Sequence, residues 1–94
     1  MRSERVIFRV HALQRMFERE ISLADIINTI EHGEIIEEYP KDEPYPSHLM
    51  LGWSGERPIH IVVGAGEQET AIVITVYQPD ADKWDTSFKH RRAK

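Results

Sequence analysis

The chain has 94 residues, of which 40% are hydrophobic, and a formal net charge of −4 at pH 7. This length fits one small domain, and no apolar run approaches the ~18–20 residues that a membrane-spanning helix needs. The absence of cysteine excludes disulfides, thiolate metal sites and cysteine nucleophiles. No apolar signal region follows the charged residues 1–5, so we expect a cytoplasmic protein without a membrane partner.

Charge is distributed unevenly along the chain. Residues 1–17 hold four arginines and one glutamate, whereas residues 18–43 hold nine acids and two bases. We expect one domain over residues 1–94, with its core in residues 6–80 and a basic tail over residues 88–94. The basic ends favour an anionic ligand and the acidic middle favours a basic partner, but the same pattern is also typical of an ordinary solvated surface.

Two helices are expected in the first third of the chain. The first spans about residues 10–20 and has no capping side chain at its start. The second begins after Ser22, with Asp25 in the capping-box position, and stops at Gly33. We expect a helical hairpin with its turn near Ile21.

Four strands are expected after these helices, because the apolar period changes. They cover about residues 34–40, 47–53, 57–63 and 70–77, and a short helix is expected at about residues 82–88. The fold class is therefore α+β, with two N-terminal helices packed on a four-stranded antiparallel sheet.

The hairpin geometry predicts which strand residues face the helices. A three-residue turn over residues 54–56 pairs Leu51 with Ile59 and directs one set of aliphatic side chains to the helices: Leu49, Leu51, Ile59, Ile61, Ile72 and Ile74. The opposite face then carries a mixed set: His48, Met50, His60, Val62, Val73, Thr75 and Tyr77. A shift of one residue in the turn moves His48 and Met50 to the helix side.

A polar stripe on the first helix predicts an anion site. His11, Arg15 and Arg19 are spaced four apart and so share one side of the helix. The helix start and the two arginines favour a neutral imidazole, which accepts a proton, and arginine can bind two phosphate oxygens at once. The alternative is a solvated polar face. Four apolar residues lie on the other side, which we expect to face the sheet: Val10, Leu13, Met16 and Phe17.

A second candidate set lies on the predicted mixed face of the sheet. His60, Thr75 and Tyr77 combine an imidazole with two hydroxyl groups, which suits metal-independent RNA cleavage because the RNA 2′-hydroxyl is itself the nucleophile. The alternatives are a partly buried histidine with its hydrogen bond satisfied and a tyrosine used for packing. Tyr45, between two prolines, is a candidate for stacking on a base.

Neither a metal nor a cofactor is expected. The five histidines form no His-x-His or His-x₃-His pair, and no thiol is present. The segment from Gly64 to Gly66 lies between two predicted strands, so it predicts a turn and not a phosphate-binding loop.

Several segments resemble the bacterial domain-of-unknown-function family 4258. They are His11-Ala-Leu-Gln-Arg15-Met-Phe-Glu-Arg19-Glu-Ile-Ser, Gly33-Glu-Ile-Ile-Glu, Tyr45-Pro46-Ser47-His-Leu, Arg57-Pro-Ile-His60 and Ile74-Thr75-Val-Tyr77-Gln-Pro79-Asp, and the resemblance covers about residues 6–80. The family is similar in pattern to small RelE- and MqsR-like toxins, and its members can be encoded beside a zinc-finger antitoxin. The resemblance therefore implies a RelE/BECR-like two-layer fold.

These observations support the hypothesis of a toxin-like, metal-independent endoribonuclease from a bacterial toxin–antitoxin system. The expected catalytic residues are His11, Arg15, His60 and Tyr77. The expected substrate-binding residues are Arg19, Thr75 and Tyr45.

The expected partners are RNA, an antitoxin protein and a second copy of the chain. Two alternatives stay open, a non-catalytic protein-binding module and a small-molecule or nucleotide sensor that uses the open face of the sheet. His11 and His60 belong to one site only if they lie within about 12 Å of each other, because groups that act on one bond must both reach it.

Overall fold

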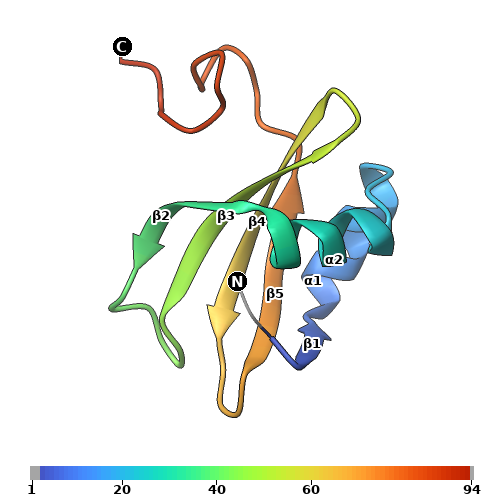
Figure 1. Ribbon diagram of the computed structural model, residues 1–94, viewed down its shortest axis with the longest axis vertical. Coiled ribbons are helices and arrows are strands. Elements are labelled where there is room, and N and C mark those ends of the chain that lie inside the picture. Colours follow the sequence, from blue (N-terminus) through green and yellow to red (C-terminus); the bar gives the residue numbers. More distant parts are fainter. Residues whose placement is uncertain (1–2, 94) are drawn as a thin grey trace.

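The computed structural model describes residues 3–93, in which two helices and five strands form two layers (Figure 1). In chain order the elements are β1 (Arg5–Phe8), α1 (Val10–Glu18), α2 (Leu23–His32), β2 (Glu34–Tyr39), β3 (Ser47–Ser54), β4 (Arg57–Ala65) and β5 (Thr70–Tyr77). The strands make one sheet in the order β1-β5-β4-β3-β2. The predicted α+β class is confirmed.

The sheet is mixed, so the prediction of four antiparallel strands is wrong. Strands β2 to β5 pair antiparallel, but β1 pairs parallel to β5, with Val6 opposite Ala71 and Phe8 opposite Val73. A parallel pair requires a crossover connection, and here most of the chain lies between the two partners. Local patterns around residues 5–8 therefore carry no sign of this pairing.

The start and end of α2 follow the predicted signals. The Asp25 N–H donates to Ser22 Oγ at 3.1 Å, and the Ser22 N–H donates to Asp25 Oδ2 at 3.2 Å, which completes a capping box. Gly33 follows the last turn, and a Cβ at that position would lie only 2.4 Å from the Thr29 carbonyl oxygen. Gly33 therefore ends the helix and permits its close approach to β3.

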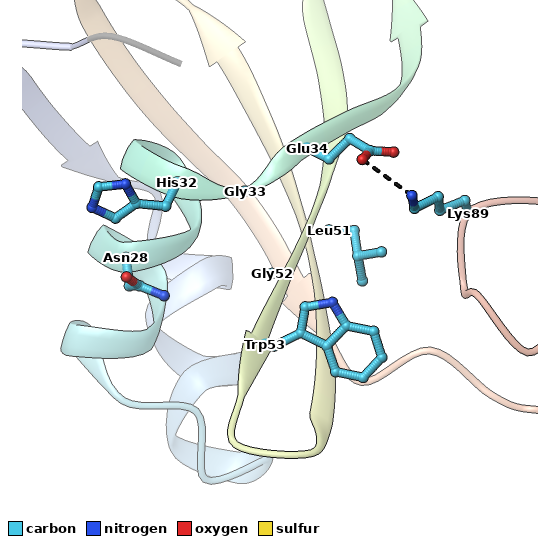
Figure 2. Close-up of a pocket in the computed structure, with 8 residues that line it drawn as sticks. All are labelled: Asn28, His32, Gly33, Glu34, Leu51, Gly52, Trp53 and Lys89. Atoms are coloured by element: carbon cyan, nitrogen blue, oxygen red, sulfur yellow. Dashed lines mark ion pairs between the residues drawn. The ribbon is translucent and has the colours of Figure 1, made fainter.

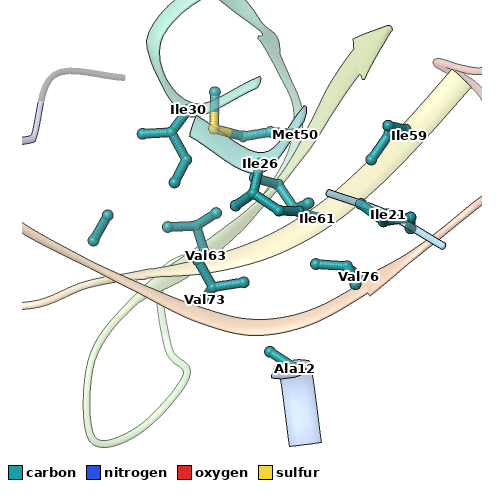
Figure 3. Packing of buried hydrophobic residues seen from close by; sticks show 11 residues of the cluster. Ala12, Ile21, Ile26, Ile30, Met50, Ile59, Ile61, Val63, Val73 and Val76 are labelled. Atoms are coloured by element: carbon teal, nitrogen blue, oxygen red, sulfur yellow. The ribbon is translucent and has the colours of Figure 1, made fainter. Parts of the chain in front are cut away.

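Both helices contribute to an aliphatic core on one face of the sheet (Figure 3). Helix α2 supplies Ile26 and Ile30, α1 supplies Ala12, and Ile21 lies between the two helices. The strands supply the remaining buried members: Met50, Ile59, Ile61, Val63, Ala71, Val73 and Val76. Burial of this apolar surface is the main force that holds the helices on the sheet.

The β3–β4 turn contains two residues and not the three expected, which changes the predicted face assignment. Ser54 pairs with Arg57, and Leu51 pairs with His60 instead of Ile59. Gly55 occupies the turn with φ +62°, a conformation that glycine adopts without steric cost and that short hairpin loops require.

The one-residue shift exchanges the two faces of β3, because side chains alternate along a strand. Met50 lies in the helix-side core, and His48 shares its side, whereas Leu49 and Leu51 face the other way. In β5, Val73 joins the helix-side core, although Ile72 and Ile74 were expected there.

Helix α1 turns its large apolar side away from the sheet, contrary to expectation. Ala12 is buried and Met16 packs against the core, and Arg19 Nη1 donates to the Val76 carbonyl oxygen at 2.8 Å. The polar stripe thus borders the sheet. Three large apolar residues of α1 are exposed instead: Val10 is 70% exposed, Leu13 49% and Phe17 88%.

The ends of α1 account for this orientation. The Arg9 N–H donates to the Val73 carbonyl oxygen at 3.1 Å, which fixes the helix start on β5. At the other end Ile21 is buried in the core. With both ends anchored, the rotation of the helix follows the path of the chain and not its apolar stripe.

No helix forms at residues 82–88, so that prediction is also wrong. Residues 79–93, here named the C-terminal strap, form turns and one β-bridge between Trp84 and Arg91. Asp80 and Asp85 accept hydrogen bonds from backbone N–H groups two residues ahead, at 2.8 and 3.1 Å, and such Asx turns compete with helix formation. Within residues 3–93, neither helix is long and apolar enough to cross a membrane.

Candidate functional site

His60 lies on the sheet face opposite the helices, where the strap covers it. Its Nε2 is 2.8 Å from the Phe88 carbonyl oxygen, and its Nδ1 is 3.2 Å from the Tyr77 hydroxyl. Because a carbonyl oxygen only accepts, Nε2 carries the proton. Burial lowers the pKa of His60, so the ring is neutral near pH 7 and the Tyr77 hydroxyl donates to Nδ1.

Aromatic rings complete the enclosure of His60. Trp84 meets it edge to face at a centroid distance of 4.5 Å, and Tyr77 does so at 5.2 Å. A second aromatic contact, Trp53 with Phe88 at 6.0 Å, holds the strap further along β3. His60 has no exposed surface, so a ligand in the cleft cannot contact it directly, whereas its hydrogen-bond partner Tyr77 lines the cleft.

Ion pairs join the strap to β2 at the edge of the sheet. The Arg91 guanidinium lies 3.1 Å from Glu37 Oε2 and 4.6 Å from the centre of the Trp84 ring. Burial opposes ionisation of Glu37, but hydrogen bonds from Tyr39 and Arg91 outweigh it and lower the pKa of this carboxyl. Burial and the neighbouring Glu37 raise the pKa of Tyr39 to about 12, so this phenol stays protonated as a donor.

A cleft of about 670 Å³ opens where β4 begins and β5 ends, between the end of α1 and the strap. The lining residues are Arg19, Arg57, Tyr77, Gln78, Asp80, Lys83, Trp84 and Arg91. Four of the eight are cations and one is a carboxylate. The domain and the strap each supply half of the lining.

Most of the positive charge in the cleft is not neutralised by acids. Arg57 donates to Gln78 Oε1 at 2.9 Å and to the carbonyl oxygens of Glu20 and Arg19, which fix the guanidinium without cancelling its charge. Lys83 forms no ion pair with any residue of the 3–93 range. Clustered cations on low-dielectric walls attract anions, and guanidinium groups match phosphate oxygens in pairs.

The structure brings some of the sequence-predicted residues together at this cleft. Arg19 and Tyr77 line it, and His60 lies directly behind Tyr77. His11, in contrast, is exposed in the first turn of α1, about 12 Å along the helix axis from Arg19. Arg15 pairs with Glu18 at 2.5 Å. Neither residue is part of the cleft lining.

The two remaining predicted residues also lie elsewhere. Thr75 is half-buried within β5, opposite Val62. Tyr45 lines a small cavity of about 30 Å³ beside Arg9.

Sequence reasoning did not identify Arg57, Lys83, Trp84 and Arg91 as site residues. The concentration of bases in the last residues of the chain was the available signal for Arg91. Arg57 and Lys83 gave none, because each is an isolated base, Arg57 at the start of β4 and Lys83 in a turn of the strap, and enters the cleft only through the tertiary fold.

A smaller pocket of about 280 Å³ lies beside the C-terminal end of α2 (Figure 2). Asn28 and His32 extend from the helix on one side, and Trp53 lies across from them. Lys89 of the strap pairs with Glu34 at 3.2 Å, so the pocket has no excess of one charge. Within residues 3–93 no group of three or more metal-binding side chains occurs.

Fold and site together define a two-layer α+β domain with a cationic cleft that a C-terminal strap completes. The chain belongs to the family described as a domain of unknown function, DUF4258, whose sequence model matches residues 8–78. No curated protein and no solved structure matches the chain significantly. The matched region extends from the end of β1 through β5 and stops before the strap.

Proposed function

We propose that the cleft binds the phosphodiester backbone of single-stranded RNA and cleaves it without a metal ion. The observation that carries the proposal is that Arg19, Arg57, Lys83 and Arg91 line one cleft together with Tyr77. This arrangement places anion-binding groups beside a hydroxyl that is hydrogen-bonded to a neutral imidazole. Both are required for transesterification of RNA, in which the nucleophile belongs to the substrate.

The cations would bind the scissile phosphate and stabilise its transition state. Arg57 is fixed by three hydrogen bonds, so it is preorganised to meet charge that develops on the phosphate oxygens. Lys83 is exposed and free to approach a leaving oxygen. Arg91 is committed to Glu37, so its contribution is to position Trp84 and the strap.

The proposed step involves three proton transfers. The 2′-hydroxyl attacks phosphorus while it gives its proton to the Tyr77 oxygen, and Tyr77 passes its own proton to His60 Nδ1. The P–O5′ bond breaks, and the Lys83 ammonium protonates the leaving 5′-oxygen. The products are a 2′,3′-cyclic phosphate and a 5′-hydroxyl. His60 then returns its proton through the Tyr77 hydroxyl to solvent in the cleft, and Lys83 takes up a proton from solvent.

A toxin role and an antitoxin partner are further parts of the proposal. Their support is the similarity in pattern between the family and small RelE- and MqsR-like toxins, together with the cleft. The cleft itself assigns no step to His11 or Arg15, because neither lines it.

Binding is tested with a fluorescently labelled oligouridylate titrated at several salt concentrations. We expect the logarithm of affinity to fall with the logarithm of salt at a slope of about −2 to −3, because three or four cations would each displace counterions. Lys83→Ala should weaken binding about tenfold, whereas the matched control Lys41→Ala, in the exposed β2–β3 loop, should not. Absence of binding at low salt contradicts the proposal.

Cleavage is tested in EDTA with the same oligonucleotide. Tyr77→Phe should lower kcat at least tenfold and leave KM nearly unchanged, because only the proton-transferring hydroxyl is removed. His11→Ala should keep full activity. If His11→Ala abolishes cleavage and Tyr77→Phe does not, the helix stripe is the site and the cleft is not.

Binding of RNA without cleavage is a second candidate function. One observation favours it, namely that no histidine belongs to the lining of the cleft within residues 3–93. In this case wild type and Tyr77→Phe bind the oligonucleotide alike and neither releases a cyclic phosphate product.

A further inference from the structure

The role of His60 follows from what surrounds it. The imidazole is completely buried and both ring nitrogens have partners, Tyr77 in the domain and Phe88 in the strap. A group in this position cannot touch a ligand. It does join the end of β5 to the strap, two parts of the chain that form the opposite walls of the cleft.

The ion pairs that hold the strap are more exposed than His60. The Arg91–Glu37 pair and the Lys89–Glu34 pair each include a side chain that is more than half exposed, and exposed ion pairs contribute little to stability. The hydrogen bond from His60 to the Phe88 carbonyl is part-buried, and its donor belongs to a side chain with no exposed surface. Without this donor a docked strap would hold the Phe88 carbonyl unpaired, and the desolvation penalty of that group would disfavour docking.

The strap is required for the cleft. It supplies four of the eight lining residues, including Lys83 and Trp84. Trp84 packs on the His60 ring, and Arg91 stacks on Trp84. Release of the strap would therefore remove one wall of the cleft and half of its cations.

We propose that His60 is a positioning residue, which docks the strap on the sheet and so builds the anion-binding cleft. Docking requires the tautomer that donates from Nε2 to Phe88 and accepts at Nδ1 from Tyr77. Glu37 and Arg91 are the charged groups nearest the ring, and Tyr77 is the titratable group that contacts it. The part of this inference that concerns RNA rests on the proposed function, whereas the docking of the strap does not.

Amide hydrogen exchange without RNA tests the docking directly. In His60→Leu, which can neither donate nor accept, we expect residues 79–93 to exchange about tenfold faster or more while β3 and β4 keep their protection. His60→Gln retains one donor and one acceptor on its amide and should restore much of the protection. Unchanged exchange in the strap of His60→Leu overturns the inference, as does loss of protection throughout the sheet.

Nitrogen NMR of wild type tests the inference without any variant. We expect the His60 ring near pH 7 to be neutral, with the proton on Nε2. An Nδ1–H tautomer or an imidazolium contradicts the proposed contacts with Phe88 and Tyr77.

Titration with the labelled oligouridylate then tests the consequence for the cleft. His60→Leu should bind about tenfold more weakly and His60→Gln nearly as well as wild type, in the same order as strap protection. If wild type binds no RNA while His60→Leu releases the strap, the proposed function fails and the positioning role stands. If wild type binds and a released strap leaves affinity unchanged, the strap does not build the binding site, and the inference is wrong.

Discussion

The two faces of the sheet are covered in different ways. On one face α2 packs Ile26 and Ile30 against aliphatic strand residues, and apolar burial of this kind is strong and non-directional. On the other face the strap is held by one buried imidazole, a few aromatic edges and exposed ion pairs. The helix face therefore stabilises the fold, whereas the strap face depends on single polar groups and on protonation.

The helix face should show the largest loss of stability. Ile61 is completely buried in the core, so Ile61→Ala removes buried methylene groups and leaves a cavity. We expect the free energy of unfolding to fall by about 2–5 kcal/mol, measured by urea denaturation. Lys41→Ala in the exposed loop serves as the control. A loss below 1 kcal/mol would mean that this face does not dominate stability.

Gly52 tests how closely α2 approaches the sheet. A Cβ at Gly52 would lie 2.0 Å from Thr29 Oγ1 and 2.7 Å from its Cβ, and Thr29 is itself buried and bonded to the Asp25 carbonyl oxygen at 2.8 Å. Gly52→Ala should therefore cost about 1–3 kcal/mol.

The same clash predicts coupling between the two positions. The double variant Gly52→Ala/Thr29→Ala should lose less stability than the sum of the two single variants, because truncation of Thr29 relieves part of the overlap. Strict additivity would show that the two residues do not meet.

One histidine on each face of the sheet should make stability depend on pH, namely His60 on the strap face and His48 on the helix face. Burial lowers the pKa of His60 and of His48 below the ordinary value of 6.5. Below pH 6.5 the unfolded chain therefore binds more protons than the folded one, and stability falls as the pH drops toward the folded pKa values. Above pH 6.5 this contribution is fully present.

Urea denaturation above and below pH 6.5 measures this dependence. His60→Gln and His48→Gln should each remove part of the slope. The pKa values of Asp25 and Glu37 are lowered from 3.8 and 4.5. These carboxyls therefore add a loss of stability only at pH values below the range in which the histidines titrate. A flat stability profile between pH 5 and 7 in wild type would contradict the buried neutral state of both histidines.

The outer side of α1 should show the smallest effect. Phe17 is 88% exposed, so Phe17→Ser removes almost no buried surface and should change stability by less than about 0.5 kcal/mol. Thermal and urea denaturation of the isolated protein provide the measurement. A loss above 1 kcal/mol would show that Phe17 packs against the domain and that α1 is rotated relative to the structure described.

The sequence indicated the local elements well where the signal was local. The capping box of Ser22 and Asp25 and the stop at Gly33 depend on residues within one helical turn of one another, and the structure confirms both. The pairing of β1 with β5 was missed, because it joins Phe8 to Val73 across the whole domain. The strand register was missed because one residue more or less in the turn at Gly55 exchanges every side chain of β3.

The candidate site was predictable only in part. Arg19 was identified from the helical stripe, and His60 and Tyr77 from their residue types and strand positions; the three lie at or behind the cleft. His11 shares a helix face with Arg19 but lies at the far end of α1, so a common stripe did not imply a common site. Arg57 reaches the cleft because it follows the β3–β4 hairpin turn, and Lys83 reaches it because it lies in the strap. No periodic pattern in the sequence indicates either position.

By itself the sequence determined the elements that depend on short-range interactions, namely the two helices and the strands that follow them. It also indicated a set of residues suited to binding an anion. Tertiary structure alone decided which side of α1 meets the sheet, which face of the sheet holds Met50 and Val73, and where residues 79–93 lie. These outcomes depend on chain crossings and on contacts between residues such as His60 and Phe88 that lie far apart in the sequence. The energies of these long-range contacts arise only once the chain is folded.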